Sequence, residues 1–251
     1  MNPIDFHDKT FIVAGAGGIG AATAIALNNY GAKIIILDID ESKVNELMPN
    51  LKGKNASYYC DFSNVNSIES LIKVIVEQHG AIDGLAFCVG VGSVRPIKMS
   101  KYDFMKRVMD INFFSFVEMI RCLSLKGNYG NDGMVIVGIS AIGAFLGNST
   151  KTAYCASKSA MNSAVRCLAK ELASKGFRIN TVAPGVTDTP MARAAEDYGS
   201  DSANYNAIID RQYLGICQPE DIADTVVYLM SNLSKKITGN CIPVDGGKLS
   251  S

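Results

Sequence analysis

The sequence predicts a doubly wound α/β domain in which about seven parallel strands are covered by helices on both faces. Short runs rich in Val and Ile alternate with longer stretches of helical character along the chain. Strands that are buried on both faces are nearly continuous apolar runs, and the crossovers that join parallel strands need helices. Of the 251 residues, 48% are hydrophobic, so a substantial core can be buried. Because no linker or internal repeat divides the chain, we expect one domain over residues 1–251.

Most of the predicted strands are rich in β-branched residues, and helices are expected between the strands. Ile68, Leu71, Ile72 and Ile75, for example, recur at helical spacing. We expect strands at 10–15, 33–38, 57–62, 84–90, 133–140, 178–184 and 239–245, and helices near 18–30, 41–48, 64–79, 100–126, 153–175 and 219–231.

The composition argues against several classes of function. Lys plus Arg and Asp plus Glu both number 24, so no net charge draws the protein to nucleic acid or to anionic lipid. The seven cysteines are widely spaced and only two histidines are present, so no zinc-binding pattern is formed. Such cysteines are typical of a reducing compartment, and no apolar run reaches the roughly 18 residues of a membrane span. We therefore expect a cytoplasmic protein without a metal, a membrane or a nucleic-acid partner.

A glycine-rich loop follows the first predicted strand. Gly15, Gly17, Gly18, Ile19 and Gly20 lie in a G-x-G-x-x-G pattern that opens the first helix. Glycine lets the backbone approach a pyrophosphate, and the helix N-terminus offers free N–H groups and a positive dipole. The strand before the loop and the helix after it are the context that the dinucleotide fingerprint requires. The sequence therefore predicts a Rossmann-type, NAD(P)-binding domain.

Asp38 ends the second predicted strand, 23 residues after Gly15. A carboxylate there can accept hydrogen bonds from the adenosine ribose and would repel a 2′-phosphate. The next residues, Ile39 and Asp40, bring no cation that would offset this repulsion. We expect NAD rather than NADP, although a solvated carboxylate at the strand end is the alternative.

Tyr154 and Lys158 lie four residues apart at the start of a predicted helix, so both side chains can share one face. A free tyrosine has a pKa near about 10, and a nearby ammonium together with an oxidised nicotinamide favours the phenolate. The phenol could then exchange a proton with an alcohol or a ketone. The alternative is a surface pair on a helix that packs its other face inward; the glycine loop favours the reaction centre.

These motifs jointly resemble those of the short-chain dehydrogenase/reductase family, in its compact single-domain branch, over essentially the whole chain. The resemblance rests on Tyr154-x-x-x-Lys158, on Asp61-Phe62 after the third strand, and on Asn112 in "DINFFS". It also rests on "NTVAPGVTDTPM" (180–191) and "ITGNCIPVDGG" (237–247).

The resemblance implies a role for each matching residue. Tyr154 would be the acid/base, Lys158 would bind the nicotinamide ribose and lower the tyrosine pKa, Ser140 would steady the substrate oxygen, and Asn112 would support a proton relay. Asp61 and Phe62 would contact the adenine. The cofactor would also be lined by Gly90, Pro184, Gly185, Thr187 and Thr189. The helices at 100–126 and 153–175 would build a homotetramer or a homodimer.

The sequence departs from the family pattern in the cofactor-binding half. The usual T-G-x-x-x-G-I-G is one residue shorter and begins with Ala14, and the usual N-N-A-G after strand four is Phe87-Cys88-Val89-Gly90. Side chains of these two motifs brace one another in the family. We expect an apolar contact in place of that polar one, with no buried donor left unpaired.

The serine assignment leaves two alternatives. Ser140 precedes Tyr154 by fourteen residues, whereas the family usually has thirteen, and a gapless match places Ala141 at the serine position. Either the intervening loop holds one extra residue and Ser140 serves, or another group holds the substrate oxygen. Neighbouring strand residues point to opposite faces, so the register decides between them.

The substrate is expected to meet three segments, 91–95, 141–150 and 191–213, with a lid near 190–215. Phe145, Leu146 and Met191 suggest an apolar wall, whereas Arg95 is either a rim residue or a contact for an anionic substrate. We predict an NAD-dependent oxidoreductase that moves a hydride between the nicotinamide and a secondary alcohol or ketone. The alternative is an NAD(H)-binding sensor or scaffold that has lost catalysis, because of the departures at Phe87, Cys88 and Ala141.

Overall fold

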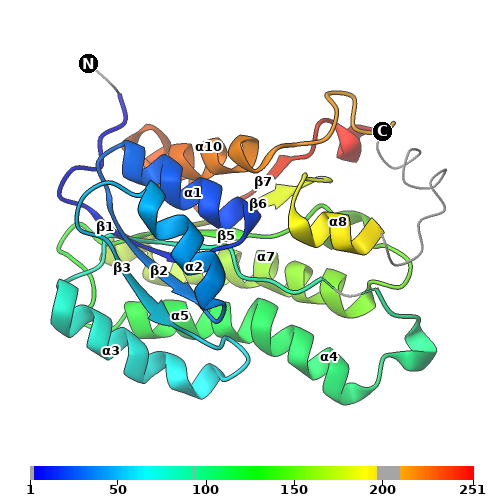
Figure 1. Cartoon of the computed structure of the whole chain (residues 1–251), viewed down its shortest axis with the longest axis horizontal. Helices are drawn as coiled ribbons and strands as arrows, with labels where there is room; N and C mark the ends of the chain where they lie inside the picture. The colour runs from blue at the N-terminus through cyan, green and yellow to red at the C-terminus, as the bar shows by residue number, and fades with distance from the viewer. Residues whose placement is uncertain (1–2, 93, 197–209) are drawn as a thin grey trace.

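A parallel sheet forms the middle layer of the molecule in the computed structural model, which describes residues 3–92, 94–196 and 210–251 (Figure 1). The strand order is β3-β2-β1-β4-β5-β6-β7, and every pair is parallel. The chain reverses its direction across the sheet between β1 and β4, and such switch points bind ligands at the carboxyl ends of the strands. The strands are β1 Thr10–Ala14, β2 Lys33–Asp38, β3 Ala56–Tyr59, β4 Gly84–Phe87, β5 Val135–Ile139, β6 Arg178–Pro184 and β7 Cys241–Val244.

Helices cover both faces of the sheet, as the sequence predicts. In Figure 1, α1, α2 and α10 lie above the sheet, while α3, α4, α5 and α7 lie below it. The Rossmann-type fold with seven strands is thereby confirmed within the described residues. The helices are α1 Gly18–Asn29, α2 Glu41–Leu47, α3 Ile68–His79, α4 Tyr102–Met109, α5 Ser115–Leu123, α6 Gly143–Leu146, α7 Thr152–Leu172, α8 Pro190–Glu196 and α10 Pro219–Met230.

Side chains of each strand alternate between two cores. On β5, Ile136 joins the core under α3, α5 and α7, whereas Val137 and Ile139 join the core under α1 and α10. Both cores are nearly closed to solvent, and burial of this apolar area is the main force that holds the layers together. The alternation also fixes the face on which residues at the strand ends appear.

The predicted helix over 100–126 is not continuous. The chain forms α4, then a π-helical turn over Asp110–Phe114 (η4), then α5. A π-turn accommodates one extra residue in the helix and is frequent at functional sites. No feature of hydrophobic periodicity distinguishes it from an ordinary helix.

Other element boundaries also differ from the prediction. The strand expected at 57–62 ends at Tyr59, because the chain then turns and Asp61 accepts the N–H of Ser63 at 2.9 Å. The short helices α6 and α8 were not expected. Among the described helices, none is both long enough and apolar enough to cross a membrane.

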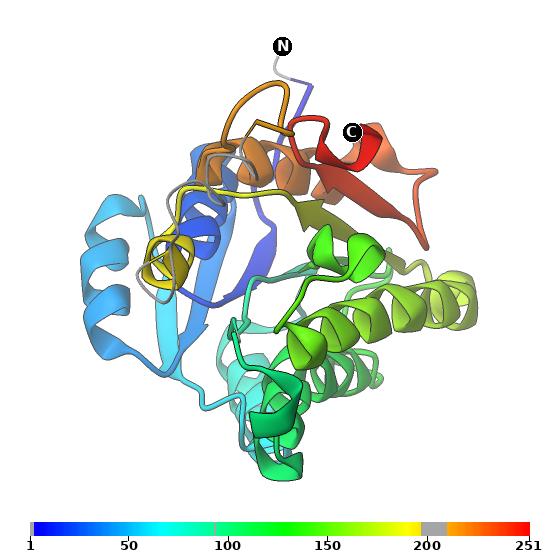
Figure 2. The same ribbon diagram turned by 90° about the vertical axis from the view of Figure 1, so that its right-hand side faces the viewer.

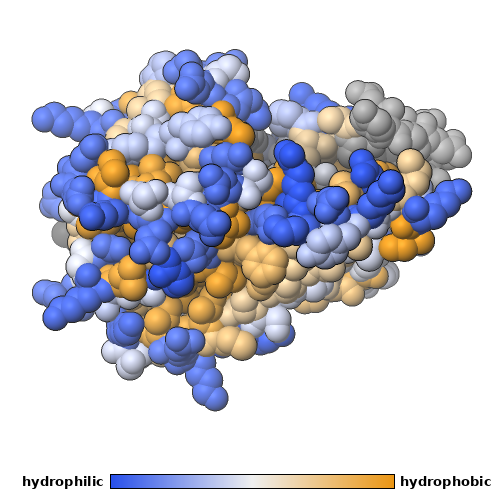
Figure 3. Space-filling model, turned by 90° about the horizontal axis from the view of Figure 1, so that it is seen from below, coloured by the Kyte–Doolittle hydropathy of each residue, from blue (hydrophilic) through white to orange (hydrophobic). Residues whose placement is uncertain are grey.

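An apolar surface lies on the side of α3, α4 and α5. Figure 3 shows hydrophobic side chains gathered across this lower face. Phe114 in the π-turn and Leu125 after α5 are both exposed.

Two glycines with the same backbone angle, Gly53 and Gly133, allow a test of how closely the loops before β5 and β6 pack against each other. Gly133 and Gly53 both have φ 83°. A Cβ at Gly133 would overlap the backbone of Gly176, while a Cβ at Gly53 would meet nothing within 4 Å. We predict that Gly53→Ala lowers the free energy of unfolding by about 1–2 kcal/mol, from the left-handed backbone alone. Gly133→Ala should lower the free energy of unfolding by at least about 2 kcal/mol more than Gly53→Ala does, because the backbones at residues 133 and 176 must move apart. Urea denaturation measures both, and equal losses would contradict this difference in packing.

Candidate active site

The glycine loop forms an open cradle at the N-terminus of α1. Gly15 has φ 97°, and a Cβ at Gly20 would overlap the carbonyl oxygen of Gly15, so the turn closes only with glycine. Gly17 caps α1 without any side-chain hydrogen bond, and a Cβ there would meet nothing within 4 Å. The space beside Gly17 at the N-terminus of α1 is therefore open, which suits a pyrophosphate.

Asp38 braces this shortened loop. One carboxylate oxygen accepts the N–H of Ala16 at 2.6 Å, and the other accepts the N–H of Asp40 at 2.9 Å. Each oxygen has a further lone pair, so the carboxylate can still accept from a ribose hydroxyl. Asp38 thus links the end of β2 to the loop after β1, an arrangement that the sequence did not reveal.

The segment after β6 approaches the same loop from the opposite side. A Cβ at Gly18 would lie 2.9 Å from the methyl carbon of Thr189, so these two residues are nearly in contact. Thr187 is buried and donates to the carbonyl of Gly185 at 3.3 Å. Pro184 ends β6 and accepts the N–H of Ile142. The residues expected to line the nicotinamide end therefore lie together beside the glycine loop.

Phe62 lies in the core rather than on a binding surface. Its ring is 5% exposed and packs edge-on against Phe87, with 5.7 Å between the ring centroids. Its side chain therefore offers nothing to an adenine, and any contact there falls to Asp61 and the backbone.

Ala14 and Phe87 form the expected apolar contact. They are register partners on β1 and β4, and both are fully buried. Among the described residues, one buried side-chain polar atom lacks a hydrogen-bond partner, the hydroxyl of Thr23 on α1, and it lies near the thiol of Cys88, the residue after Phe87. Packing therefore replaces the polar brace between Ala14 and Phe87, while the Thr23 hydroxyl near Cys88 is left without a hydrogen bond.

Lys158 is a buried cation on α7. Its ammonium donates to the carbonyl of Ile139 at 2.7 Å, and 3% of the residue is exposed. Burial lowers the pKa of Lys158 to about 8, because the charged form is desolvated. A Cβ at Gly90 would lie 3.2 Å from this nitrogen, so glycine there leaves room for the ammonium.

Whereas the sequence predicts that the ammonium and an oxidised nicotinamide together lower the pKa of Tyr154, this pKa is raised in the protein alone. Burial raises it to about 12, with a smaller contribution from Cys155. The ammonium of Lys158 lies 5.9 Å from the centre of the tyrosine ring and is bonded to Ile139. In this protein alone, desolvation outweighs the attraction of the lysine charge, so the phenol keeps its proton at neutral pH.

Asn112 connects three segments from its place in the π-turn. Its side-chain oxygen accepts the N–H of Val91 at 2.8 Å, and its amide donates to the hydroxyl of Ser157 at 3.0 Å. Ser157 in turn donates to the carbonyl of Tyr154 at 2.7 Å. This chain of hydrogen bonds holds the start of α7 against the segment that follows β4. Sequence reasoning missed Ser157, which looks like any small residue on a helix.

Ser140 lies on the α7 side of the sheet. Gly138, two residues earlier, faces Phe116 and Met161, whereas Ile139 points into the opposite core. The Ser140 hydroxyl is buried and lies 3.4 Å from the carbonyl of Lys158. Ser140 therefore faces the backbone of α7 at Lys158, and its role at the substrate oxygen, in place of Ala141 or another group, stays a prediction.

The expected substrate-facing segments meet at one end of the molecule. Figure 2 shows α6 and α8 at the same end as the C-terminal turn. Phe145, Leu146 and Met191 are each about half exposed there. Arg95 is exposed, and its guanidinium stacks 3.9 Å from the centre of the Phe104 ring, as a rim residue would. Of the expected lid, residues 197–209 lie outside the described residues.

Sequence reasoning also missed Gln212, which lies in a stretch of mixed polarity without any periodic signal. It is 3% exposed, and its side-chain amide bonds to the backbone of Val186, beside Gly185.

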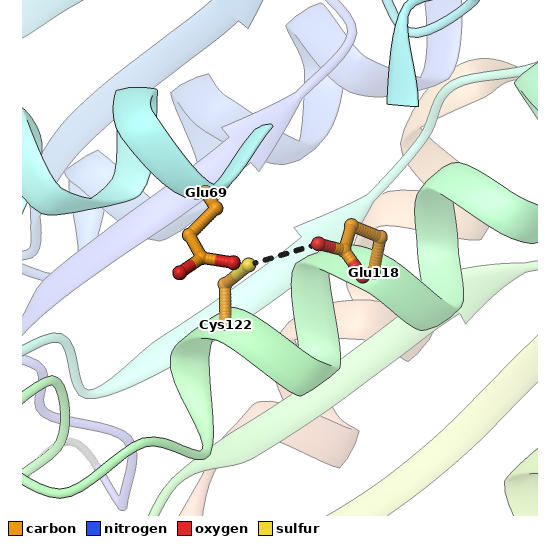
Figure 4. A group of neighbouring side chains, drawn as sticks. All are labelled: Glu69, Glu118 and Cys122. Carbon is orange, nitrogen blue, oxygen red and sulfur yellow. Dashed lines mark hydrogen bonds between the residues drawn. The ribbon is translucent and has the colours of Figure 1, made fainter. Parts of the chain in front are cut away.

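A second cluster of potential metal ligands lies away from this site. Glu69 on α3 approaches Glu118 and Cys122 on α5 (Figure 4). Arg121 forms ion pairs with both carboxylates, and burial raises the pKa of the Cys122 thiol to about 12. A metal needs the thiolate and would have to displace the arginine. We therefore assign the cluster as an ion-pair network that joins α3 to α5.

Comparisons with known proteins agree with this architecture. A family model described as enoyl-(acyl carrier protein) reductase matches residues 13–248. The chain is 34% identical to the 3-oxoacyl-[acyl-carrier-protein] reductase FabG of Rickettsia typhi, over 98% of this chain and 99% of the relative. It is 29% identical to 7alpha-hydroxysteroid dehydrogenase of Escherichia coli K12, over 95% and 93%.

A solved structure extends the likeness to three dimensions. A single-substitution variant of actinorhodin polyketide ketoreductase, solved with NADPH, is 25% identical and superposes with a TM-score of 0.87. The match covers 96% of this chain and 97% of that one.

The buried lysine should make stability depend on alkaline pH. The pKa of Lys158 is about 8 in the folded protein and 10.5 in the unfolded chain, so the unfolded chain binds more protons between these values. The free energy of unfolding should therefore rise with pH in this window, by about 1–3 kcal/mol. We predict that the stability of the native protein relative to Lys158→Met increases by this amount from pH 8 to pH 10. Denaturation at several pH values measures it, and a constant difference would show that the ammonium is not desolvated.

Proposed function

This chain belongs to the short-chain dehydrogenase/reductase family, and within it we propose an NAD-dependent oxidoreductase that interconverts a secondary alcohol and a ketone. The observation that carries the proposal is the position of Tyr154 and the buried Lys158 beside an open glycine cradle. Both relatives are named for reactions of this kind, on an oxoacyl group and on a hydroxysteroid. We also take the whole chain as one cofactor-binding domain.

The residues of the cradle fit a nicotinamide dinucleotide. Gly17 leaves open space for a pyrophosphate at the N-terminus of α1, and Thr189 packs against Gly18 next to it. Asp61 lies outside the core, where it could contact the adenine. The segment from Pro184 to Thr189 lies at the opposite end of the cradle, where it could contact the nicotinamide. When bound, the nicotinamide would supply or accept the hydride.

Asp38 favours NAD over NADP. Its carboxylate is fixed by two backbone N–H groups, so it cannot turn away from a 2′-phosphate without opening the glycine loop. The shortened loop also contains no arginine or lysine that would bind such a phosphate. The ketoreductase solved with NADPH shows that the fold also accommodates the phosphorylated cofactor, so the proposal for this chain rests on Asp38.

Tyr154 would transfer the proton. With its pKa raised to about 12, the phenol begins as an acid, which suits protonation of a ketone oxygen during reduction. In the oxidative direction the same group must become a base, and the charges of Lys158 and of an oxidised nicotinamide would have to lower that pKa. Ser140 would hold the substrate oxygen, and Asn112 would keep the start of α7 in place.

The substrate would enter past an apolar rim. Phe145 and Leu146 on α6 and Met191 on α8 expose apolar side chains at this end, whereas Arg95 is stacked on Phe104. We therefore expect the part of the substrate that reacts to be uncharged.

We also propose a homotetramer or homodimer. The exposed apolar residues on the side of α4 and α5, including Phe114, would be covered by a second copy of the chain.

Two substitutions separate catalysis from binding. We predict that Tyr154→Phe lowers kcat by about 10²–10⁴-fold, because the transferable proton is lost, while the Kd for NADH stays within about twofold. Ser140→Ala should lower kcat/KM by about 10–100-fold, since one hydrogen bond to the reacting oxygen disappears. NADH consumption with a panel of ketones measures both. If Ser140→Ala has no effect, another group holds that oxygen. Binding of NADH without turnover on any ketone or alcohol would favour a sensor or scaffold.

A second pair of substitutions tests the choice of cofactor. We predict that the native protein prefers NAD to NADP by at least about tenfold in kcat/KM, and that Asp38→Asn narrows this ratio by removing the charge. The asparagine oxygen can still accept the N–H of Ala16, so the loop should survive. Asp40→Asn is the matched control, because this neighbouring carboxylate caps α2 and should not change the ratio. A native preference for NADP would contradict the role of Asp38.

A further inference from the structure

The side chain of Gln212 binds the backbone beside the nicotinamide segment. Its carbonyl oxygen accepts the N–H of Val186 at 2.5 Å, and its amide nitrogen donates to the carbonyl oxygens of Val186 at 3.2 Å and Gly215 at 2.8 Å. The residue is 3% exposed, so these bonds are shielded from water. The amide thereby satisfies both backbone groups of Val186, as a neighbouring strand would.

Close packing around Gly185 shows that this contact is built into the fold. A Cβ on Gly185 would lie 2.7 Å from the Gln212 oxygen and 2.8 Å from the Cα of Asp245. On its other side, a Cβ on Gly246 would lie 3.3 Å from the Cβ of Gln212. Gln212 is therefore held between the segment after β6 and the turn after β7.

The backbone around Gln212 continues the same connection. The N–H of Cys217 donates to Val186 at 3.1 Å, and the N–H of Asp188 donates to Cys217 at 2.9 Å. These bonds tie residues 212–217 to residues 185–188. Thr189 follows directly and lies against Gly18 of the glycine loop. A shift at Val186 would therefore move the residues that face the nicotinamide half of the cofactor site.

We propose that Gln212 is a positioning residue that fixes the segment from Gly185 to Thr189 for the nicotinamide half of the cofactor. The inference rests on the proposed function, because that function assigns this segment to the nicotinamide. The hydrogen bonds of the Gln212 side chain go to the segments 186 and 215–217 rather than to the glycine loop. Its loss should consequently weaken binding of the nicotinamide half and leave binding of the adenosine and pyrophosphate half unchanged.

Asn28 offers a matched control for a purely structural amide. It is also buried, and its side chain also bonds to backbone groups, at Ala32 and Lys52. It lies on α1 and contacts the chain after α2, away from the segment after β6. Gln212→Met and Asn28→Leu each remove the amide while nearly preserving side-chain volume, so both should lower stability.

The experiment compares two probes on the full chain, NADH and ADP-ribose, which lacks the nicotinamide. For Gln212→Met we expect the Kd for NADH to rise about tenfold or more, as the loss of one or two hydrogen bonds allows, with the Kd for ADP-ribose within about twofold of native. Asn28→Leu should change neither Kd. The fluorescence of bound NADH, which reports the surroundings of the nicotinamide, should shift in Gln212→Met alone.

Several outcomes would overturn the proposal. An unchanged Kd for NADH in Gln212→Met contradicts it, and so does an equal loss of affinity for both probes, which would indicate a general structural role. If Gln212→Met does not fold, Gln212→Glu decides, because its carboxylate can still accept the N–H of Val186 but cannot donate; its Kd for NADH should exceed the native value, and a native value would refute the proposal. A native chain that binds neither probe would instead contradict the proposed function itself.

Discussion

The arrangement of the site depends on one buried charge, the ammonium of Lys158. Among the described residues it donates to one carbonyl, that of Ile139 at the end of β5, and its lowered pKa reflects the loss of hydration. The surroundings are adapted to it: Gly90 leaves the space, and the chain from Val91 through Asn112 and Ser157 to Tyr154 holds α7 in register. An ammonium that has one acceptor in the described part of the chain retains hydrogen-bonding capacity for ribose hydroxyls. The free-energy cost of burying this ammonium is explained if the charge binds a ligand.

The cofactor cradle has been rebuilt around a shorter loop without losing its openness. Asp38 closes the loop through Ala16, and the contact between Ala14 and Phe87 replaces a polar brace by packing in the core. These departures from the family pattern are therefore compensated locally. In the proposed site, the carboxylate that shapes the loop would also set the charge next to the ribose, so cofactor choice and loop geometry would be coupled.

Most of the fold could be predicted because burial on both faces leaves a strong signal in β-branched runs and in the helices between them. The cofactor loop and the pair Tyr154–Lys158 could be located because their spacing has a physical meaning. The rest could not be predicted from pattern. The π-turn around Asn112 has the same periodicity as a helix, Gln212 acts through a backbone contact that no local signal encodes, and the pKa of Tyr154 depends on burial that only the fold determines.

The central claim is that this chain itself moves a hydride between a nicotinamide and a carbonyl carbon. The most direct measurement is transfer of deuterium from NADH labelled at the nicotinamide C4, followed by mass spectrometry of the product alcohol. We predict one deuterium on the carbinol carbon, delivered from one of the two C4 positions. A protein that binds NADH at the glycine loop yet transfers no deuterium to any ketone of a broad panel would contradict this claim.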